Sequence, residues 1–445
     1  MRSPSRDDAR HPTPRAGRSG SRREAAISQE ASVPAPQAAS TPGPSPAPAR
    51  ATFGEVFAVG EFRALWAAQV LSVAGDQLAR VALTLLVFHR THSPLLAAVT
   101  FAASVVPTFV GGIVLSGLAD RLPRRQVMIA CDLVRAGLVA VMALSGIPIA
   151  VLVCLLFLVT LISAPFSAAR AALYADILPE DRYVLGQAVT LTTLQFAQVL
   201  GFAIGGVTVG FFGVRTSLLI DAFTFAASAL ITRLWVQART ASRAGHAPGE
   251  SSAAGFAAGV RLVFGNSALR TPMLLGWVCA FYNAPEGIAV PLAASLAGGA
   301  VAVGMLLASL ALGASVGAIA FSRFVQPAQR LRWTGPLAAM ACAVLTLFVF
   351  RPPLPVALAI LAMSGLCDSY QVAASAAFVA ATPAGQRSQA FGIAQGGMSL
   401  GQGAAMVLAG AAAERYAPGS VIAVSGAIGT VAAIFIGMTR TSAQG

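Results

Sequence analysis

A succession of apolar runs dominates the sequence from Arg63 onward, each roughly 20 residues long. As an α-helix, such a run crosses the roughly 30 Å hydrocarbon core of a bilayer. Hydrophobic residues make up 56% of the 445 residues and charged residues only 11%, whereas roughly a quarter of the residues of a soluble domain are charged. A water-soluble fold could not bury so much apolar surface. The sequence therefore predicts an all-α membrane protein.

We expect twelve transmembrane helices in two six-helix halves. The expected spans are residues 63–88, 95–117, 126–146, 148–169, 184–211, 214–235, 271–295, 300–322, 332–350, 354–378, 388–413 and 419–439.

Four regions organise the chain. Residues 1–55 are a basic tail rich in Pro, Ser and Ala, which we expect to be disordered. Residues 56–235 and 271–445 hold the two six-helix halves, and residues 236–270 link them. The linker should contain a short amphipathic helix on the membrane surface, because Phe256, Val260, Val263 and Phe264 recur at helical spacing.

An internal repeat relates the two halves. A shift of 206 residues places "VGGIVLSGLAD" on "VGAIAFSRFVQ" and superposes Gly186 on Gly392 and Leu194 on Leu400. Six spans keep the same orientation, so the repeat is parallel, with an axis along the membrane normal. Such repeats are typical of membrane transporters.

The basic residues predict an orientation. All 30 are arginines, and the formal net charge is +13. If the N-terminus is cytoplasmic, only Arg90, Arg215, Arg351 and Arg415 fall in the outer loops. The positive-inside rule then places both termini in the cytoplasm, in a multi-pass protein of the inner (plasma) membrane. The arginines are scattered along loops instead of forming one patch, which argues against a nucleic-acid partner.

Metal and cofactor chemistry finds no support in the sequence. The five cysteines lie inside apolar runs without a CxxC pattern, and the four histidines have no metal-ligand spacing. The sequence also contains no ATP-binding P-loop. We therefore expect no metal, no cofactor and no enzymatic activity.

The segment "SGLADRLPRRQ" carries the most specific motif. It resembles motif A of the major facilitator superfamily, which lies between helices 2 and 3 of that family. Gly117, Asp120, Arg121, Arg124 and Arg125 match the pattern, whereas Ser116 and Pro123 replace two of its glycines. The resemblance implies that this loop latches the two halves together in one conformational state. The alternative is a plain topological loop, which accounts for the arginines but not for Asp120.

A second segment, "VLGFAIGGVTVG", is similar to motif C of drug/proton antiporters in that superfamily. Gly201, Gly205 and Gly206 match, and Phe202 replaces the proline of the motif. Small residues at this spacing also allow two helices to approach closely, so simple packing is an equal alternative. The resemblance covers about residues 55–440. Within the superfamily it is nearest to the branch of enterobactin exporters and macrolide efflux proteins.

Charged residues inside the expected spans are candidates for function, because they are costly in lipid. Asp76 and Arg80 lie four residues apart on one helix and can pair. The repeat makes Arg80 equivalent to Glu286, and the resemblance implies that their helices face each other across the cavity. Arg80 is thus expected to pair either with Asp76 or with Glu286. We assign proton coupling to these three residues.

Four further charged residues lie in spans. Asp132 and Arg135 are near the inner end of helix 3 and are expected to join the charge cluster of motif A. Asp221 and Asp368 are candidates for contact with a substrate in the cavity.

Together these features predict a monomeric secondary transporter in membrane lipid. We expect it to export a small hydrophobic compound, such as a drug or natural product, by proton antiport with alternating access. Uptake or facilitated diffusion by the same fold is one alternative. A membrane sensor or scaffold that does not transport is another.

Overall fold

The computed structural model describes residues 52–114, 122–178, 180–239, 253–383 and 386–441. The helices of the first half are α1 (Phe53–Ala58), α2 (Gly60–Thr91), α3 (Pro94–Ala102), α4 (Val106–Val114), α6 (Arg124–Met142), α7 (Ile149–Ile177) and α8 (Glu180–Trp235). Those that follow are α9 (Ala253–Gly265), α10 (Ser267–Trp277), α11 (Cys279–Gly287), α12 (Ala289–Ser295), α13 (Ala300–Phe324), α14 (Pro327–Ala343), the 3₁₀ helix η1 (Val344–Phe350), α15 (Leu354–Cys367), α16 (Tyr370–Ala381), α17 (Arg387–Ala413) and α18 (Pro418–Thr441).

The expected spans appear as helices, with breaks that have local causes. α8 holds two expected spans, which Gly213 separates at a φ of 80°, a backbone conformation that glycine adopts at no steric cost. The expected span 271–295 is divided among α10, α11 and α12. Its prolines Pro272, Pro285 and Pro291 have no N–H to donate to a helical hydrogen bond.

The 206-residue shift of the sequence also relates the helix ends. α7 begins at Ile149 and α15 at Leu354, and α8 begins at Glu180 and α17 at Arg387. Each pair of starts agrees with the shift to within one residue. The same local structure is therefore built twice along the chain.

Seven helical stretches in the described part are long and apolar enough to cross a membrane. Others fall short for identifiable reasons: α3 and α4 have nine residues each, and α6 contains Arg124, Arg125, Asp132 and Arg135. The number twelve therefore stays a prediction.

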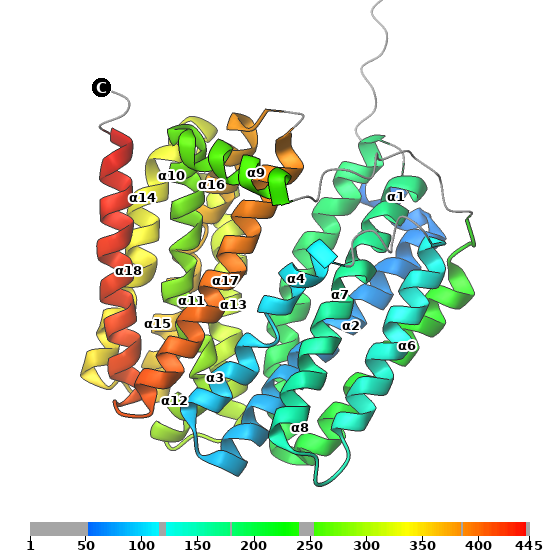
Figure 1. Cartoon of the computed structure of the whole chain (residues 1–445), viewed down its shortest axis with the longest axis horizontal. Coiled ribbons are helices and arrows are strands. Elements are labelled where there is room, and N and C mark those ends of the chain that lie inside the picture. Colours follow the sequence, from blue (N-terminus) through cyan, green and yellow to red (C-terminus); the bar gives the residue numbers. More distant parts are fainter. Residues whose placement is uncertain (1–51, 115–121, 179, 240–252, 384–385, 442–445) are drawn as a thin grey trace, which may run out of the picture. The chain divides into compact units, whose positions relative to one another are not determined.

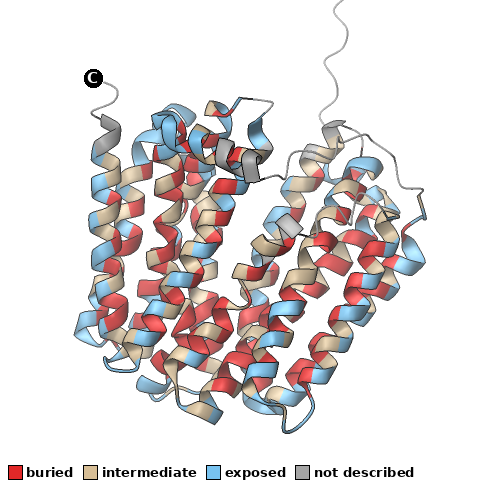
Figure 2. Ribbon diagram, in the orientation of Figure 1, coloured by how far each residue is buried: buried red, intermediate tan, exposed pale blue. Residues whose placement is uncertain are grey.

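Residues 50–445 form one compact unit, in which the helices of each half pack side by side (Figure 1). Buried residues lie between the helices, and exposed residues lie on their outward surfaces (Figure 2). Many of the exposed side chains are large and apolar, among them Phe211, Phe223, Leu408, Val431 and Phe435. In a membrane protein such a surface faces lipid.

The linker helix α9 forms, and one of its apolar side chains is buried. Val263 on α9 is fully buried and packs with Ala390 and Ile393 of α17 and with Leu269 of α10. Val263 of α9 therefore packs on the second half of the protein, and contact of this helix with the membrane surface stays a prediction.

The two halves touch through two pairs of small residues. On α8 and α13, Gly206 and Gly304 are so close that a Cβ on Gly206 would lie 2.8 Å from the Cα of Gly304. On α17 and α3, a Cβ on Gly410 would lie 2.4 Å from the Cβ of Ala98. Ala98 and Gly304 are 206 positions apart, so the repeat relates one member of the first contact to one member of the second.

Candidate functional site

Arg135 of α6 is the centre of a buried charge cluster in the first half. Its Nη2 donates to both carboxylate oxygens of Asp76 on α2, at 2.7 and 2.9 Å. The Arg135 side chain is only 3% exposed and that of Asp76 26% exposed. An ion pair so far from water needs close geometry to offset the loss of hydration.

Two further helices complete the surroundings of Arg135. Its guanidinium lies 4.0 Å from the ring centroid of Phe225 on α8, a cation–π contact. Asp132 lies 3.7 Å from Arg135 Nη1 and accepts a hydrogen bond of 2.6 Å from Ser228 of α8. The cluster therefore joins α2, α6 and α8 in the middle of the half.

The ion pairs of the described residues do not include the predicted one between Asp76 and Arg80. Much of the motif A loop lies outside the described residues, so the place of Asp132 and Arg135 in its charge cluster stays a prediction. Arg80 instead donates to the carbonyl of Ser104 at 3.2 Å. Ser104 lies in the break between α3 and α4, where helix-end carbonyls lack helical partners. Arg135 reaches Asp76 from a neighbouring helix, and this contact replaces the local one.

Asp221 of α8 lies beside this cluster. It is 1% exposed, and its Oδ1 accepts a hydrogen bond from Thr224 at 3.3 Å. Its Oδ2 has no hydrogen-bond partner in the described part of the protein. Gly75 on α2 makes this closeness possible, because a Cβ there would lie 2.3 Å from Asp221 Oδ1. Asp76, Arg80, Arg135 and Asp221 line one small cavity of about 40 Å³.

Glu286 of α11 lies in the second half among apolar side chains, including Leu306 and Leu310 of α13. The ion pairs of the described residues do not include one between Glu286 and Arg80. The expected pair between the halves is therefore not formed in this conformation.

Asp368 belongs to a second polar network, in the second half. It accepts a hydrogen bond from the hydroxyl of Tyr282. Tyr282 also lies 3.3 Å from the hydroxyl of Tyr370 and accepts from Gln371 at 3.3 Å. Asp368, Tyr282 and Gln371 line a cavity of about 340 Å³, together with Trp277 and Phe391. This cavity has the mixed apolar and polar lining of a small-molecule site.

Of the motif A residues, Gly117, Asp120 and Arg121 lie outside the described residues. Arg124 forms an ion pair with Asp176 at the end of α7, and Arg125 donates to the carbonyl of Arg233 at the end of α8. Both arginines therefore bind within the first half. A cation at the carbonyl end of a helix is also favoured by the helix dipole.

The three glycines of the motif C-like segment contact two different helices. A Cβ on Gly201 would lie 2.9 Å from the Cβ of Gln77, and one on Gly205 would lie 3.1 Å from the Cα of Leu78, both on α2. Gly206 instead meets α13 of the other half. The segment thus packs α8 against its own half and against the other half at once.

Sequence reasoning missed a contact between the halves at the end of α3. Glu414, at the end of α17, accepts hydrogen bonds from the Ser93 hydroxyl and from the backbone N–H of Leu95, the latter at 3.0 Å. Ser93 is the N-cap of α3, where a carboxylate is favoured by the free N–H groups and the dipole. The one available signal was the "HSP" sequence, which predicts a helix start but not its partner.

We expect Glu414→Ala to loosen this end of the interface. The hydrogen bonds hold the pKa of Glu414 below its ordinary range. The stabilisation is therefore present above the ordinary glutamate pKa and is lost only as the pH falls through the lowered value. A cysteine at Ala98, in a variant without native cysteines, should react several-fold faster with a membrane-impermeant maleimide after Glu414→Ala. Arg415→Ala is the matched control, and equal rates in all three proteins would contradict the contact.

The described residues contain no group of three or more His, Cys, Asp or Glu side chains arranged for a metal ion. Ion pairs and hydrogen bonds hold the two polar networks together. The first network brings carboxylates and arginines together in a buried cluster, and the second lines a cavity large enough for a small organic molecule.

Comparison with known proteins gives a family and several relatives. The model of the Major Facilitator Superfamily matches residues 65–369. The multidrug efflux pump Tap of Mycobacterium tuberculosis is 27% identical over 321 residues, which cover 67% of this chain and 74% of the pump. The uncharacterized transporter YkuC of Bacillus subtilis is 25% identical over 184 residues, which cover 40% of this chain and 42% of YkuC.

Solved structures share the fold at low sequence identity. The POT family transporter PepTSo superposes with a TM-score of 0.66 at 13% identity, covering 86% of this chain and 98% of its own. The nucleoside transporter NupG gives 0.64 at 14% identity, covering 84% and 98%. A bacterial homologue of the human lysosomal transporter Spinster, in an inward-facing and occupied conformation, gives 0.62 at 14% identity, covering 85% and 93%.

Proposed function

Because the chain belongs to the Major Facilitator Superfamily, we propose that it exports a small hydrophobic compound by proton antiport with alternating access. The observation that carries this proposal is the Asp76–Arg135 pair beside Asp221, inside a membrane domain. Ionisable groups at such depth are costly in lipid and are typically retained for ion movement. The similarity to multidrug efflux pumps supports export over uptake.

Proton coupling is assigned to the cluster of the first half. Asp76, Asp132 and Asp221 provide three carboxyl groups near the three cations Arg80, Arg135 and Arg170. A proton on Asp76 would release Arg135, and the freed guanidinium could then turn toward Asp132 or Asp221. Asp76 is the best carrier of the three, because its side chain is the most exposed.

Substrate binding is assigned to the cavity of about 340 Å³ in the second half. Trp277, Phe378 and Phe391 offer apolar surface, whereas Asp368 and Gln371 offer one charge and one amide. Phe109 of α4, in the first half, packs against Gly396 of α17 in the second half. A movement between the halves would therefore change the shape of this cavity.

Arg80 and Glu286 remain candidates for an ion pair in another state of the cycle. Arg80 donates a hydrogen bond to the carbonyl of Ser104 and forms no ion pair within the described part of the protein, so its partner can change. Cysteines at positions 80 and 286 should crosslink in at least one state of the transporter. The narrower resemblance to enterobactin and macrolide exporters also stays a proposal.

Everted membrane vesicles test the proposal directly. With ethidium as the probe, an imposed pH gradient should drive its uptake into vesicles that carry the wild-type protein. Asp76→Asn should remove the dependence on the gradient, whereas Glu55→Gln, which neutralises an exposed acid outside the cluster, should keep it. An unchanged pH response in Asp76→Asn would exclude Asp76 as the carrier. If no lipophilic amine or neutral drug moves in a proton-dependent way, the sensor or scaffold alternative is favoured.

The proposed topology has twelve spans and both termini in the cytoplasm. Reporter fusions after Gly245 and at the C-terminus should both read cytoplasmic, because the loop arginines gather on that side. A fusion after Arg351 is the internal control and should read periplasmic. A periplasmic signal from either of the first two fusions would overturn the topology.

A further inference from the structure

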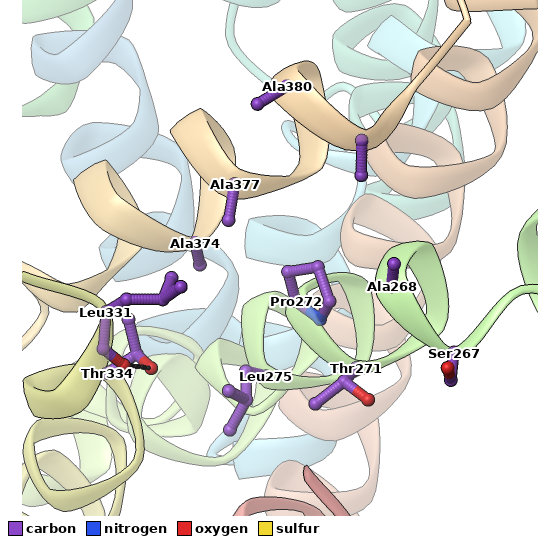
Figure 3. Close-up of a pocket in the computed structure, with 11 residues that line it drawn as sticks. Ser267, Ala268, Thr271, Pro272, Leu275, Leu331, Thr334, Ala374, Ala377 and Ala380 are labelled. Carbon is purple, nitrogen blue, oxygen red and sulfur yellow. Dashed lines mark hydrogen bonds between the residues drawn. The ribbon is translucent and has the colours of Figure 1, made fainter. Parts of the chain in front are cut away.

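A cavity of about 540 Å³ lies in the second half between α10, α14 and α16 (Figure 3). Thr271, Leu275, Thr334 and Ala374 are buried at its inner end, whereas Ala268 and other residues at its mouth are exposed. The mouth lies at the start of α10, next to the linker. Among the residues that the structure describes, the lining contains no charged side chain.

The internal repeat allows the cavity to be compared with the equivalent positions of the first half. The four lining residues Ala268, Thr271, Thr334 and Ala380 are 206 positions after Phe62, Leu65, Met128 and Tyr174, respectively. Those four large side chains are all buried and pack together in the core of the first half. The rings of Phe62 and Tyr174 lie 5.5 Å apart. The fold thus fills this place with side chains in one half and leaves it open in the other.

An empty volume of this size is unfavourable, because the groups that line it lose their packing partners. The lining fits a neutral, apolar guest. The depth from Ser267 to Leu275 is eight residues of helix, or roughly 12 Å, which suits a chain that enters from the membrane surface. Leu331, which lines the cavity, is equivalent in the repeat to Arg125 of the first half. The second half therefore has an apolar side chain at this position and the first half a charged one.

Charged residues next to the lining indicate which apolar chain enters. Arg270 and Arg332 are exposed and adjoin the lining residues Thr271 and Leu331 in the sequence. The first half has Ala64 and Gln126 at the equivalent positions. Exposed arginines near the membrane surface attract the anionic headgroups of phospholipids. We propose that this cavity binds one acyl chain of an anionic phospholipid, whose headgroup lies beside Arg270 and Arg332.

The experiment uses the full-length protein, purified in detergent and stripped of lipid. Dioleoyl-phosphatidylglycerol is added, and bound lipid is counted by native mass spectrometry while the thermal midpoint is followed. The wild-type protein should retain this lipid and gain thermal stability. Dihexanoyl-phosphatidylglycerol should do neither, because its chains are too short to fill the cavity.

Two variants test whether the bound lipid occupies this cavity. Ala268→Phe with Ala380→Tyr restores the side chains of the first half, and should lower occupancy of the tightest lipid site at least tenfold. Val379→Tyr, one residue away and outside the lining, should leave binding unchanged. Full retention of lipid by the filled variant would overturn the proposal, as would displacement of the lipid by ethidium.

A third variant keeps the test decisive if the filled protein does not fold. Arg270→Gln with Arg332→Gln leaves the cavity open, and should abolish the preference for dioleoyl-phosphatidylglycerol over dioleoyl-phosphatidylcholine. An undiminished preference would rule out the headgroup site. Transport does not enter these measurements, so the inference stands or falls independently of the proposed export.

Discussion

Replacing Arg135 with methionine is expected to abolish transport and to destabilise the first half by about 3–5 kcal/mol. The substitution removes the only cation in ion-pair distance of Asp76 and Asp132 in the described part of the protein. Asp132 is fully buried and would lose its partner at ion-pair distance. Unfolding in detergent and ethidium transport in vesicles would measure the two effects.

Companion variants separate the charge of Arg135 from its shape. Arg135→Lys keeps the charge but cannot bind both Asp76 and Ser72 through one planar group, so we expect an intermediate loss. Asp76→Asn in the Arg135→Met background should recover part of the stability, since it removes one of the unpaired charges. If Arg135→Met is as stable as the wild type, the contacts of Arg135 with Asp76 and Asp132 do not stabilise the protein.

Gly206→Leu is expected to reduce transport by at least about tenfold. A Cβ at this position would lie 2.7 Å from the carbonyl oxygen of Ala300 and 2.8 Å from the Cα of Gly304. Both are backbone atoms and cannot rotate away, so α8 and α13 would have to separate. Overpacking of this kind costs about 1–3 kcal/mol. It should destabilise the conformation in which α8 and α13 are in contact.

Two further substitutions control the Gly206 prediction. Gly304→Leu should have a similar effect, because the close approach is reciprocal. Gly392→Leu adds the same side chain to another helix, where a Cβ meets nothing within 4 Å, and should transport normally. Normal transport by Gly206→Leu would show that this crossing is not required in the cycle.

The candidate site was only partly predictable from the sequence. Asp76, Arg80, Asp221 and Glu286 stand out because each is a charge inside an apolar run, which needs no structure to notice. Their partners could not be found in the same way. Spacing along one helix favours Asp76 with Arg80, yet Arg135 from α6 forms the pair, because side chains of neighbouring helices compete with those on the same helix.

The sequence by itself determined the class of the protein, its helical character and its two-fold repetition. These are local or periodic properties: an apolar run of sufficient length must cross the membrane as a helix, because lipid offers no partners for backbone groups. Only the tertiary structure decided which groups meet. It paired Arg135 with Asp76, set Gly206 against Gly304, placed Glu414 on the start of α3 and left a cavity where the repeat has Phe62 and Tyr174. Such contacts depend on how helices far apart in the chain pack, and packing is a property of the assembled bundle.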